Sequence, residues 1–319
     1  MDRQHLTRRE ALARTGLLAG ALAALPGQAG RAAPAIAAAS KPSVVYCLNT
    51  GTIRGQKLGL EREIEIAAKA GYHAIEPWVE AIDQFAKAGG SLRDLRSRIG
   101  DHGLTVESAI GFPEWIVDDD ARRAAGLERA RREMDLVAQI GGKRLAAPPA
   151  GATNQSGLDL QKAAERYRAL LAVGEAIGVT PQVELWGPSR NVHLLSEAAF
   201  IAIQSGHPKA CVLADVYHLY RGGSDFHGLR LLSRPMLQVF HMNDYPAEPP
   251  RDKLNDGHRV FPGDGVAPLT EILRDLLASG PGLVLSLELF NRQYWEQDAL
   301  EVAKAGLEKM KAAVARVKA

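Results

Sequence analysis

Short apolar runs alternate with longer amphipathic stretches along most of the chain. The short runs have the length and content of strands that are buried on both faces of a parallel sheet. The longer stretches repeat their apolar residues at helical spacing, and several of them end at glycine. The predicted strands are residues 43–48, 74–77, 105–109 and 144–147, a run ending at residue 184, and residues 211–215, 236–241 and 283–288. The predicted helices are residues 58–70, 92–102, 121–140, 158–177, 193–204, 225–232, 268–278 and 297–318.

This order of elements predicts an α/β fold of a single domain, the (β/α)8 TIM barrel. Eight strands that alternate with eight helices favour a closed barrel over an open, doubly wound sheet. Residues 36–319 have the length of one such barrel and suit it better than two small domains.

Four of the predicted strands carry an acid or an imidazole at or near their exit. Glu184 ends the fifth strand and Asp215 the sixth, with His218 three residues further on. His241 lies on the seventh strand and Glu288 on the eighth. Because the carboxyl ends of barrel strands meet at one face, these side chains are expected to converge on one point there.

Residues 1–35 follow a different pattern and are predicted to be a twin-arginine signal peptide. Arg8 and Arg9 form the arginine pair, a weakly apolar run covers residues 15–25, and Ala33-Pro34-Ala35 is a candidate cleavage site. The run is shorter than the roughly 20 apolar residues that cross a bilayer, which argues against a membrane span. A disordered basic tail is the other alternative. Because the arginine pair, the apolar run and the cleavage site occur in this order, we favour the signal peptide and expect a periplasmic or otherwise exported protein that is exported already folded.

Charge and cysteine content narrow the classes of partner. The whole chain has 39 basic and 37 acidic residues, and without residues 1–35 it has 34 and 35. A nearly neutral protein has no general basic field to hold nucleic acid, and no long apolar stretch is available for stable membrane association. Cys47 and Cys211 fall in different apolar strands, so we expect buried free thiols and no disulfide.

The longest predicted connection, residues 243–265, directly follows His241. A solvated insertion is one interpretation of a loop of this length. The other, which we favour, is a lid or substrate clamp over the barrel mouth that brings His258 and Arg259 to the substrate.

Several motifs in this order resemble the xylose isomerase-like TIM-barrel superfamily, and in particular exported members described as sugar phosphate isomerase/epimerase or AP endonuclease 2-like. The motifs are Glu184, Asp215-x-x-His218, His241-x-Asn243-Asp244, Pro262-Gly263-Asp264-Gly265 and Glu288, with local matches at residues 71–78 and 111–115. The superfamily contains ketohexose 3-epimerases, inosose isomerases and dehydratases, hydroxypyruvate isomerases and endonuclease IV. The resemblance extends over residues 43–317.

The resemblance implies one divalent cation held by four residues, Glu184, Asp215, His241 and Glu288. Three carboxylates and one imidazole are a hard donor set, so Mn²⁺ is expected ahead of Mg²⁺, Co²⁺ or Zn²⁺. Glu184 and Glu288 would then remove and return a proton on opposite faces of a sugar carbon, and His218 would hydrogen-bond the oxygen where charge develops. The candidate substrate-binding residues are Glu76, Trp78, Trp186, His258 and Arg259. The alternative to substrate contact is a surface or helix-capping role for Glu76 and packing in the apolar core for Trp78 and Trp186.

The predicted function is a metal-dependent isomerase or epimerase that acts through an enediolate. Export and the lack of a glycine-rich phosphate cradle favour an unphosphorylated keto sugar or keto glycoside as the small-molecule substrate. A lyase or dehydratase for 3-keto glycosides or cyclitols is the alternative with the same site. An endonuclease IV-like nuclease fits less well, because only Asp256 and His258 resemble that family's additional metal ligands, and a non-catalytic sugar-binding module would need no acid–base pair. The carbon that reacts and the oligomeric state stay open.

Overall fold

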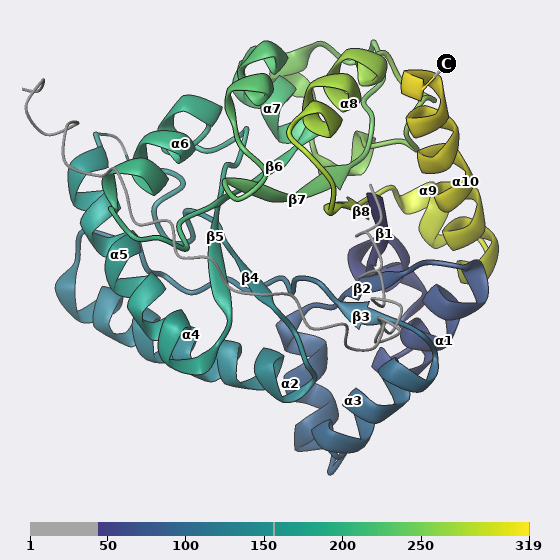
Figure 1. The fold of residues 1–319 in the computed structure, drawn as a ribbon, viewed down its shortest axis with the longest axis horizontal. Coiled ribbons are helices and arrows are strands. Elements are labelled where there is room, and N and C mark those ends of the chain that lie inside the picture. The colour runs from purple at the N-terminus through teal and green to yellow at the C-terminus, as the bar shows by residue number, and fades with distance from the viewer. Residues whose placement is uncertain (1–43, 156, 319) are drawn as a thin grey trace, which may run out of the picture. The chain divides into compact units, whose positions relative to one another are not determined.

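The computed structural model describes residues 44–155 and 157–318, and the predicted signal peptide lies outside this part of the chain. All eight strands of the predicted barrel are present in it and are parallel (Figure 1). They are β1 (Val44–Asn49), β2 (Ala74–Glu76), β3 (Thr105–Val106), β4 (Arg144–Ala147), β5 (Thr180–Glu184), β6 (Val212–Asp215), β7 (Leu237–Met242) and β8 (Leu283–Leu287).

The strands form a ring with helices around its outside, which confirms the TIM barrel (Figure 1). Seven neighbouring pairs are linked in the order β3-β2-β1-β8-β7-β6-β5-β4. The ring closes between β3 and β4 through Ala109, whose N–H donates to Arg144 and whose carbonyl accepts from Ala146. β3 is shorter than predicted: outside the regular ladder, Ala109 pairs with β4, and Ile110 pairs with the end of β2 through Pro77 and Trp78.

The predicted helices are present within a few residues of their expected ends, with one exception. Residues 225–232 form a 3₁₀ turn, η3 (Phe226–Leu231), and not an α-helix. Within the described residues, three α-helices and the 3₁₀ helix η2 (Thr50–Gln56) were not predicted. Of the three α-helices, α7 starts at the very end of β6, with the Asp215 carboxylate as its N-cap. The helices are α1 (Leu60–Ala70), α2 (Val79–Lys87), α3 (Leu92–Asp101), α4 (Asp120–Gln139), α5 (Leu160–Ile177), α6 (Leu195–Gln204), α7 (Val216–Gly222), α8 (Leu269–Ala278), α9 (Arg292–Trp295) and α10 (Ala299–Lys318), and the unpredicted ones are α2, α7 and α9.

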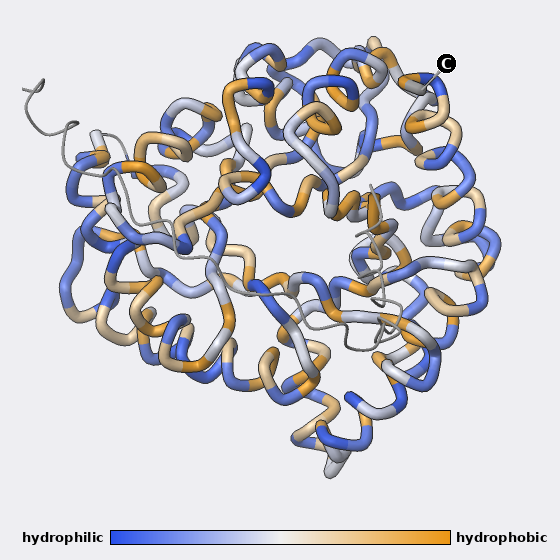
Figure 2. Tube along the Cα trace, viewed as in Figure 1, coloured by the Kyte–Doolittle hydropathy of each residue, from blue (hydrophilic) through white to orange (hydrophobic). Residues whose placement is uncertain are grey.

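The apolar core has two layers, as expected for a barrel. The larger one packs the outer face of the strands against the helices, along which apolar and polar positions alternate (Figure 2). A smaller cluster joins side chains from different strands, among them Cys47, Ala74, Leu213, Val239 and Val284. This cluster forms the floor beneath the carboxyl ends of the strands. Cys47 and Cys211 are buried free thiols, as predicted.

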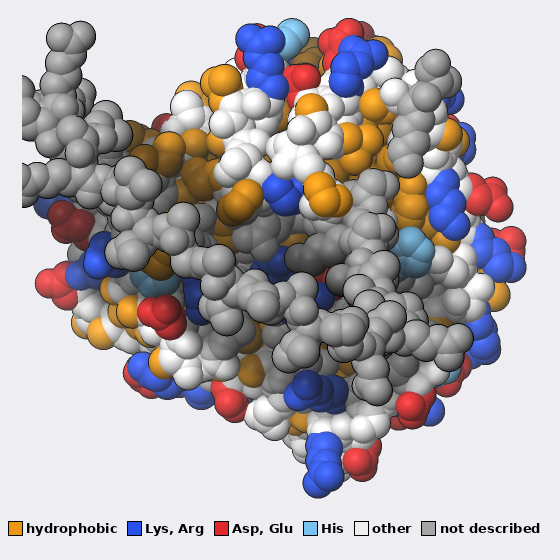
Figure 3. Space-filling view, in the orientation of Figure 1, with side chains coloured by type: hydrophobic (Ala, Val, Ile, Leu, Met, Phe, Trp, Pro, Cys, Tyr) orange, Lys and Arg blue, Asp and Glu red, His pale blue; other side chains and the backbone are white. Residues whose placement is uncertain are grey.

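On the surface, basic and acidic side chains are intermixed around the described part of the face in Figure 3. Within the described residues, none of the helices has the length and apolar content that a membrane crossing requires.

The long connection 243–265 is packed onto the barrel and is ordered by Asp244. The backbone of Asp244 pairs with that of Val260, and its carboxylate accepts the N–H groups of Gly263, Gly265 and Ala267 at 2.9, 3.2 and 2.9 Å. A Cβ on Gly265 would lie 2.2 Å from the carbonyl oxygen of Tyr245, which explains the glycine there. Two 3₁₀ turns, η4 (Arg251–Lys253) and η5 (Asp256–His258), lead back to the barrel mouth.

Candidate active site

A pocket of about 590 Å³ opens at the carboxyl end of the strands. Its volume is within the range of pockets that bury a small molecule. The predicted residues Trp78, Glu184, Trp186, His218, Arg259 and Glu288 line it, together with Arg54, Ile110, Phe112, Thr153, Asn154, Pro188, Ser189, Asp256 and Phe290.

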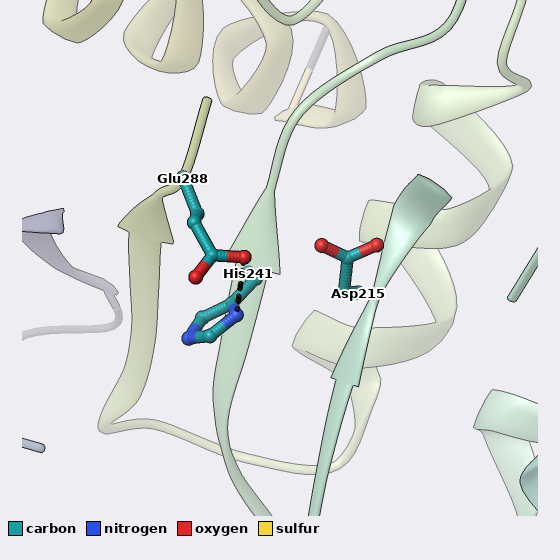
Figure 4. Close-up of side chains that lie close together, drawn as sticks. All are labelled: Asp215, His241 and Glu288. Carbon is teal, nitrogen blue, oxygen red and sulfur yellow. Dashed lines mark ion pairs between the residues drawn. The ribbon is translucent and has the colours of Figure 1, made fainter. Parts of the chain in front are cut away.

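Three of the four predicted metal ligands form a compact buried group. Each of Asp215, His241 and Glu288 offers one ligand atom, and these atoms lie within 4.8 Å of one another. The three come from the neighbouring strands β6 and β7 and the end of β8 (Figure 4). Glu184, the fourth predicted ligand, lines the same pocket and is 4% exposed.

Arg259 supplies the positive charge between these carboxylates. Its Nη1 atom lies 2.9 Å from Asp215 Oδ2 and 2.7 Å from Glu288 Oε2. Its Nη2 atom donates to Asp256, which is half exposed. Only 1% of Arg259 is exposed, so its charge and those of Asp215 and Glu288 face each other out of water. The long connection therefore places Arg259 inside the site.

His241 lies between two buried carboxylates. Its Nδ1 is 3.1 Å from Glu288 Oε2, and its Nε2 is 3.0 Å from Glu76 Oε2. Burial lowers the pKa of His241, but Glu288 and Glu76 raise it more, so the pKa is well above its ordinary value. Glu76 is fully buried behind the imidazole, where it also accepts from Asn49 Nδ2 at 3.0 Å and Ser286 Oγ at 2.6 Å. This contact fits a residue that fixes the position of the His241 ring, and the substrate contact of Glu76 stays a prediction.

The pKa values of the two predicted proton-transfer residues, Glu184 and Glu288, are shifted in opposite directions. Burial is the largest cause that raises the pKa of Glu184, and together with the charges of Glu288 and Asp215, against the lowering effect of His241, it brings the pKa to about 8. Burial also raises the pKa of Glu288, but His241 and Arg259 lower it more, so the carboxyl stays far below its ordinary value. At neutral pH one carboxyl therefore holds a proton and the other is ionised, which is the arrangement of a general acid and a general base.

His218 is fixed with one ring nitrogen directed toward Arg259. Its Nδ1 accepts the N–H of Gly187 at 3.2 Å. Burial lowers the pKa of His218, which keeps the ring neutral. A Cβ on Gly187 would lie 2.7 Å from the His218 carbonyl oxygen, so this close approach requires glycine. His218 Nε2 is 3.1 Å from Arg259 Nη2, a hydrogen bond whose donor and acceptor depend on the tautomer of the ring.

Aromatic rings from four different strand ends line the pocket. Trp78 and Trp186 were predicted from their places after β2 and β5. Phe112 and Phe290 were not, because a phenylalanine after a strand carries no sign of whether it faces the helices or the pocket. All four rings are partly exposed.

The remaining predicted residue, His258, has a local structural contact. Its Nδ1 accepts the N–H of Asn255 at 3.1 Å and so caps η5, the turn that presents Arg259. Two asparagines were overlooked as site residues. Asn49 Nδ2 donates to Glu288 Oε1 at 3.1 Å, and Asn243 Nδ2 donates to Asp215 Oδ2 at 2.7 Å. Their signal in the sequence is that each directly follows or ends an apolar strand, as the predicted acids do.

Comparison with known proteins gives a consistent set of relatives. Residues 64–313 match the family described as xylose isomerase-like TIM barrel. An inosose isomerase of Bacillus velezensis is 25% identical over 275 residues, which cover 85% of this chain and 97% of that protein. A 3-dehydroshikimate dehydratase of Pseudomonas aeruginosa is 27% identical over 240 residues, which cover 73% of this chain and 36% of that protein.

Among solved structures, the IOLI protein with a binding zinc atom has a similar fold, with a TM-score of 0.79. It is 21% identical, and the match covers 86% of this chain and 99% of that one.

Proposed function

Because this chain belongs to the xylose isomerase-like TIM barrel family, we propose that it is a metal-dependent isomerase or epimerase of an unphosphorylated keto sugar or keto glycoside. The observation that carries the proposal is the pairing of Glu184 and Glu288. Both carboxyls line one pocket, beside the Asp215–His241–Glu288 group, and their pKa values are displaced in opposite directions.

The donor set fits a divalent cation. Asp215, His241 and Glu288 would hold the ion, with Glu184 as the fourth ligand, and the crowding of buried acids favours an added positive charge. A cation bound there would polarise a ketone and so make the neighbouring carbon–hydrogen bond more acidic. Oxygen donors outnumber the single imidazole, which favours Mn²⁺, and the zinc of the related IOLI structure supports a divalent ion in general.

Proton transfer falls to Glu184 and Glu288. We assign removal of the proton next to the ketone to one of these two carboxyl groups and the return of a proton from the other face to the other, through an enediolate. For the reverse reaction the two residues exchange roles. His218 lines the pocket beside Arg259, and we assign to its ring the hydrogen bond to a substrate oxygen that gains negative charge.

The charges of the pocket support a substrate without phosphate. Arg54 and Arg259 are the cationic side chains among the lining residues described, and Arg259 already pairs with three carboxylates. Arg54 lies at the mouth, with its guanidinium 4.2 Å above the ring of Trp78. Residues 1–35 support export through the twin-arginine pathway as part of the same proposal, since sugar phosphates are mainly cytoplasmic.

The same site supports a lyase as a second candidate. The related 3-dehydroshikimate dehydratase is the observation that favours it. An enediolate that expels a leaving group, in place of being protonated again, gives elimination, and Glu184 in its protonated state is placed to assist departure.

Deuterium incorporation from heavy water, followed by NMR, tests the proposal. The metal-loaded protein is expected to exchange the proton next to the ketone in 3-keto sugars or 3-keto glycosides, and to lose at least 100-fold in rate when Glu184 or Glu288 becomes Gln. New vinylic signals would identify the lyase. Turnover of phosphorylated ketoses with no exchange in the unphosphorylated compounds would overturn the proposal.

A further inference from the structure

The pocket contains a cluster of carboxyl groups and a connected set of aromatic rings. The carboxyl groups come from β5 to β8 and the connection after β7. Trp78 follows β2 and Phe112 follows β3, while Trp186 and Phe290 follow β5 and β8 and adjoin the carboxyl groups. A monosaccharide with hydroxyls on every side does not require so many rings, whereas a ligand with a polar head and a flat apolar tail does.

The aromatic half is a connected arc. The ring centroids of Phe290 and Trp78 are 6.0 Å apart, those of Trp78 and Phe112 5.4 Å, and those of Phe112 and Trp186 5.9 Å. Ile110 lines the pocket beside them. We call the four rings, Trp78, Phe112, Trp186 and Phe290, the aromatic arc.

The arc is fixed before any ligand arrives. Trp78 Nε1 donates to Asn49 Oδ1 at 3.2 Å, and Phe290 meets the Trp78 ring edge-on at an interplanar angle of 80°. The indole N–H is thus already used, and what Trp78 offers to a ligand is its carbon surface. Asn49 also donates to Glu288. One side chain therefore fixes the position of Trp78 relative to Glu288.

Partly exposed rings around a pocket leave apolar surface in water. Covering such surface stabilises a complex by roughly 25 cal/mol per Å², and well-placed ring pairs add roughly 0.5–1.5 kcal/mol each. The cavity of about 590 Å³ is in the range that accepts drug-sized ligands, so a sugar head leaves room for a second group.

We propose that the substrate is a keto glycoside with an aromatic aglycone, whose sugar ring lies at Glu184 and Glu288 and whose aglycone lies against the aromatic arc. This inference rests on the proposed function for the sugar half and adds the chemical class of the other half. The reaction that supplies such a substrate is the oxidation of one secondary hydroxyl of an aryl glycoside to a ketone.

Two sets of matched ligands test the aglycone and the reaction separately. Calorimetry on the Mn²⁺-loaded protein measures binding of methyl, octyl and phenyl β-glucosides, which carry no ketone and need no turnover. NMR exchange measures kcat/KM for the three corresponding 3-keto glucosides. We expect phenyl to exceed methyl by roughly ten- to a hundred-fold in both measurements, and octyl to fall below phenyl, because stacking needs a flat ring.

Variants locate the effect in the pocket. Phe112→Ala is expected to reduce the phenyl-to-methyl ratio toward one. Phe200→Ala, which removes a phenylalanine that is 38% exposed on α6, is the matched control and is expected to leave the ratio as it is.

The possible failures are distinct. Phenyl binding within a few fold of methyl binding, or octyl binding as tight as phenyl, overturns the aromatic aglycone. Preferential phenyl binding without exchange in any keto compound supports the aglycone and overturns the isomerase proposal. Exchange at equal kcat/KM for the methyl and phenyl 3-keto glucosides supports the isomerase proposal and overturns the aromatic aglycone.

Discussion

Replacing Arg259 with Met is expected to make the stability of the protein depend on metal. Arg259 is 1% exposed, and its Nη1 atom lies 2.9 and 2.7 Å from the carboxylates of Asp215 and Glu288, whose side chains are 1% and 5% exposed. Methionine retains much of the volume and removes the charge. Two buried carboxylates then lose their counter-charge, which by analogy with other buried pairs costs about 3–5 kcal/mol. The contact with Asp256 adds little, because that carboxylate is half exposed.

A bound divalent cation is expected to offset much of this loss. The guanidinium and the ion are both attracted by Asp215 and Glu288 and repel one another, so the variant should bind Mn²⁺ more tightly than the parent protein. An ion at 100 times its dissociation constant contributes about 2.7 kcal/mol to stability. Urea unfolding with a chelator and with Mn²⁺, together with calorimetric titration, measures both effects.

The matched control is Arg251→Met, which removes an exposed arginine from the same connection. It is expected to change the free energy of unfolding by less than about 0.5 kcal/mol. Equal stability of Arg259→Met and the parent protein in chelator, or weaker Mn²⁺ binding by the variant, would refute the assignment of Arg259 as the counter-charge of the acid group.

Glu76→Gln is expected to weaken Mn²⁺ binding by roughly 10–100-fold, since the carboxylate 3.0 Å from His241 Nε2 fixes the imidazole; calorimetry checks this, and unchanged affinity would contradict it. Glu63, on α1, tests pH dependence away from the site: burial raises its pKa from 4.5 to about 7 against the lowering effect of Arg54. The folded protein keeps this proton at pH values where the unfolded chain has released it, so the contribution of Glu63 to stability is most favourable below about pH 4.5 and becomes less favourable as the pH rises to about 7. Glu63→Gln should therefore be more stable than the parent protein at pH 8, by about 2–3 kcal/mol, and urea unfolding at pH 5 and pH 8 would disprove this if the difference between the two proteins were the same at both.

The sequence was sufficient for the barrel and for the convergence of the charged residues. Apolar runs that end in Glu184, Asp215 or His241 place the polar group at a strand end, and parallel strands of a barrel bring their ends together whatever the loops do. The helix α7 was missed because Asp215 has two roles. One of its oxygens caps the helix at the His218 N–H, and the other faces Arg259, which a pattern of strand exits does not reveal.

Contacts between segments that are far apart in the chain could not be predicted from the sequence. Arg259 was predicted to touch substrate, but its position between Asp215 and Glu288 depends on the path of the connection that Asp244 holds in place. The role of Glu76 depends on which side of His241 it lies, and a single residue of register decides this. The aromatic arc likewise depends on the rotamers of its rings and not on their spacing along the chain.

The two cysteines have a consequence for the chemistry that the protein withstands. Both thiols are fully buried, Cys47 in the barrel floor and Cys211 just before β6. Burial raises the pKa of Cys211 to about 12 and that of Cys47 well above its ordinary value, so neither supplies an appreciable amount of thiolate at neutral pH. Peroxide and disulfide reagents react with cysteine through the thiolate, and the folded chain is therefore expected to keep both cysteines as free thiols in reducing and in oxidising surroundings.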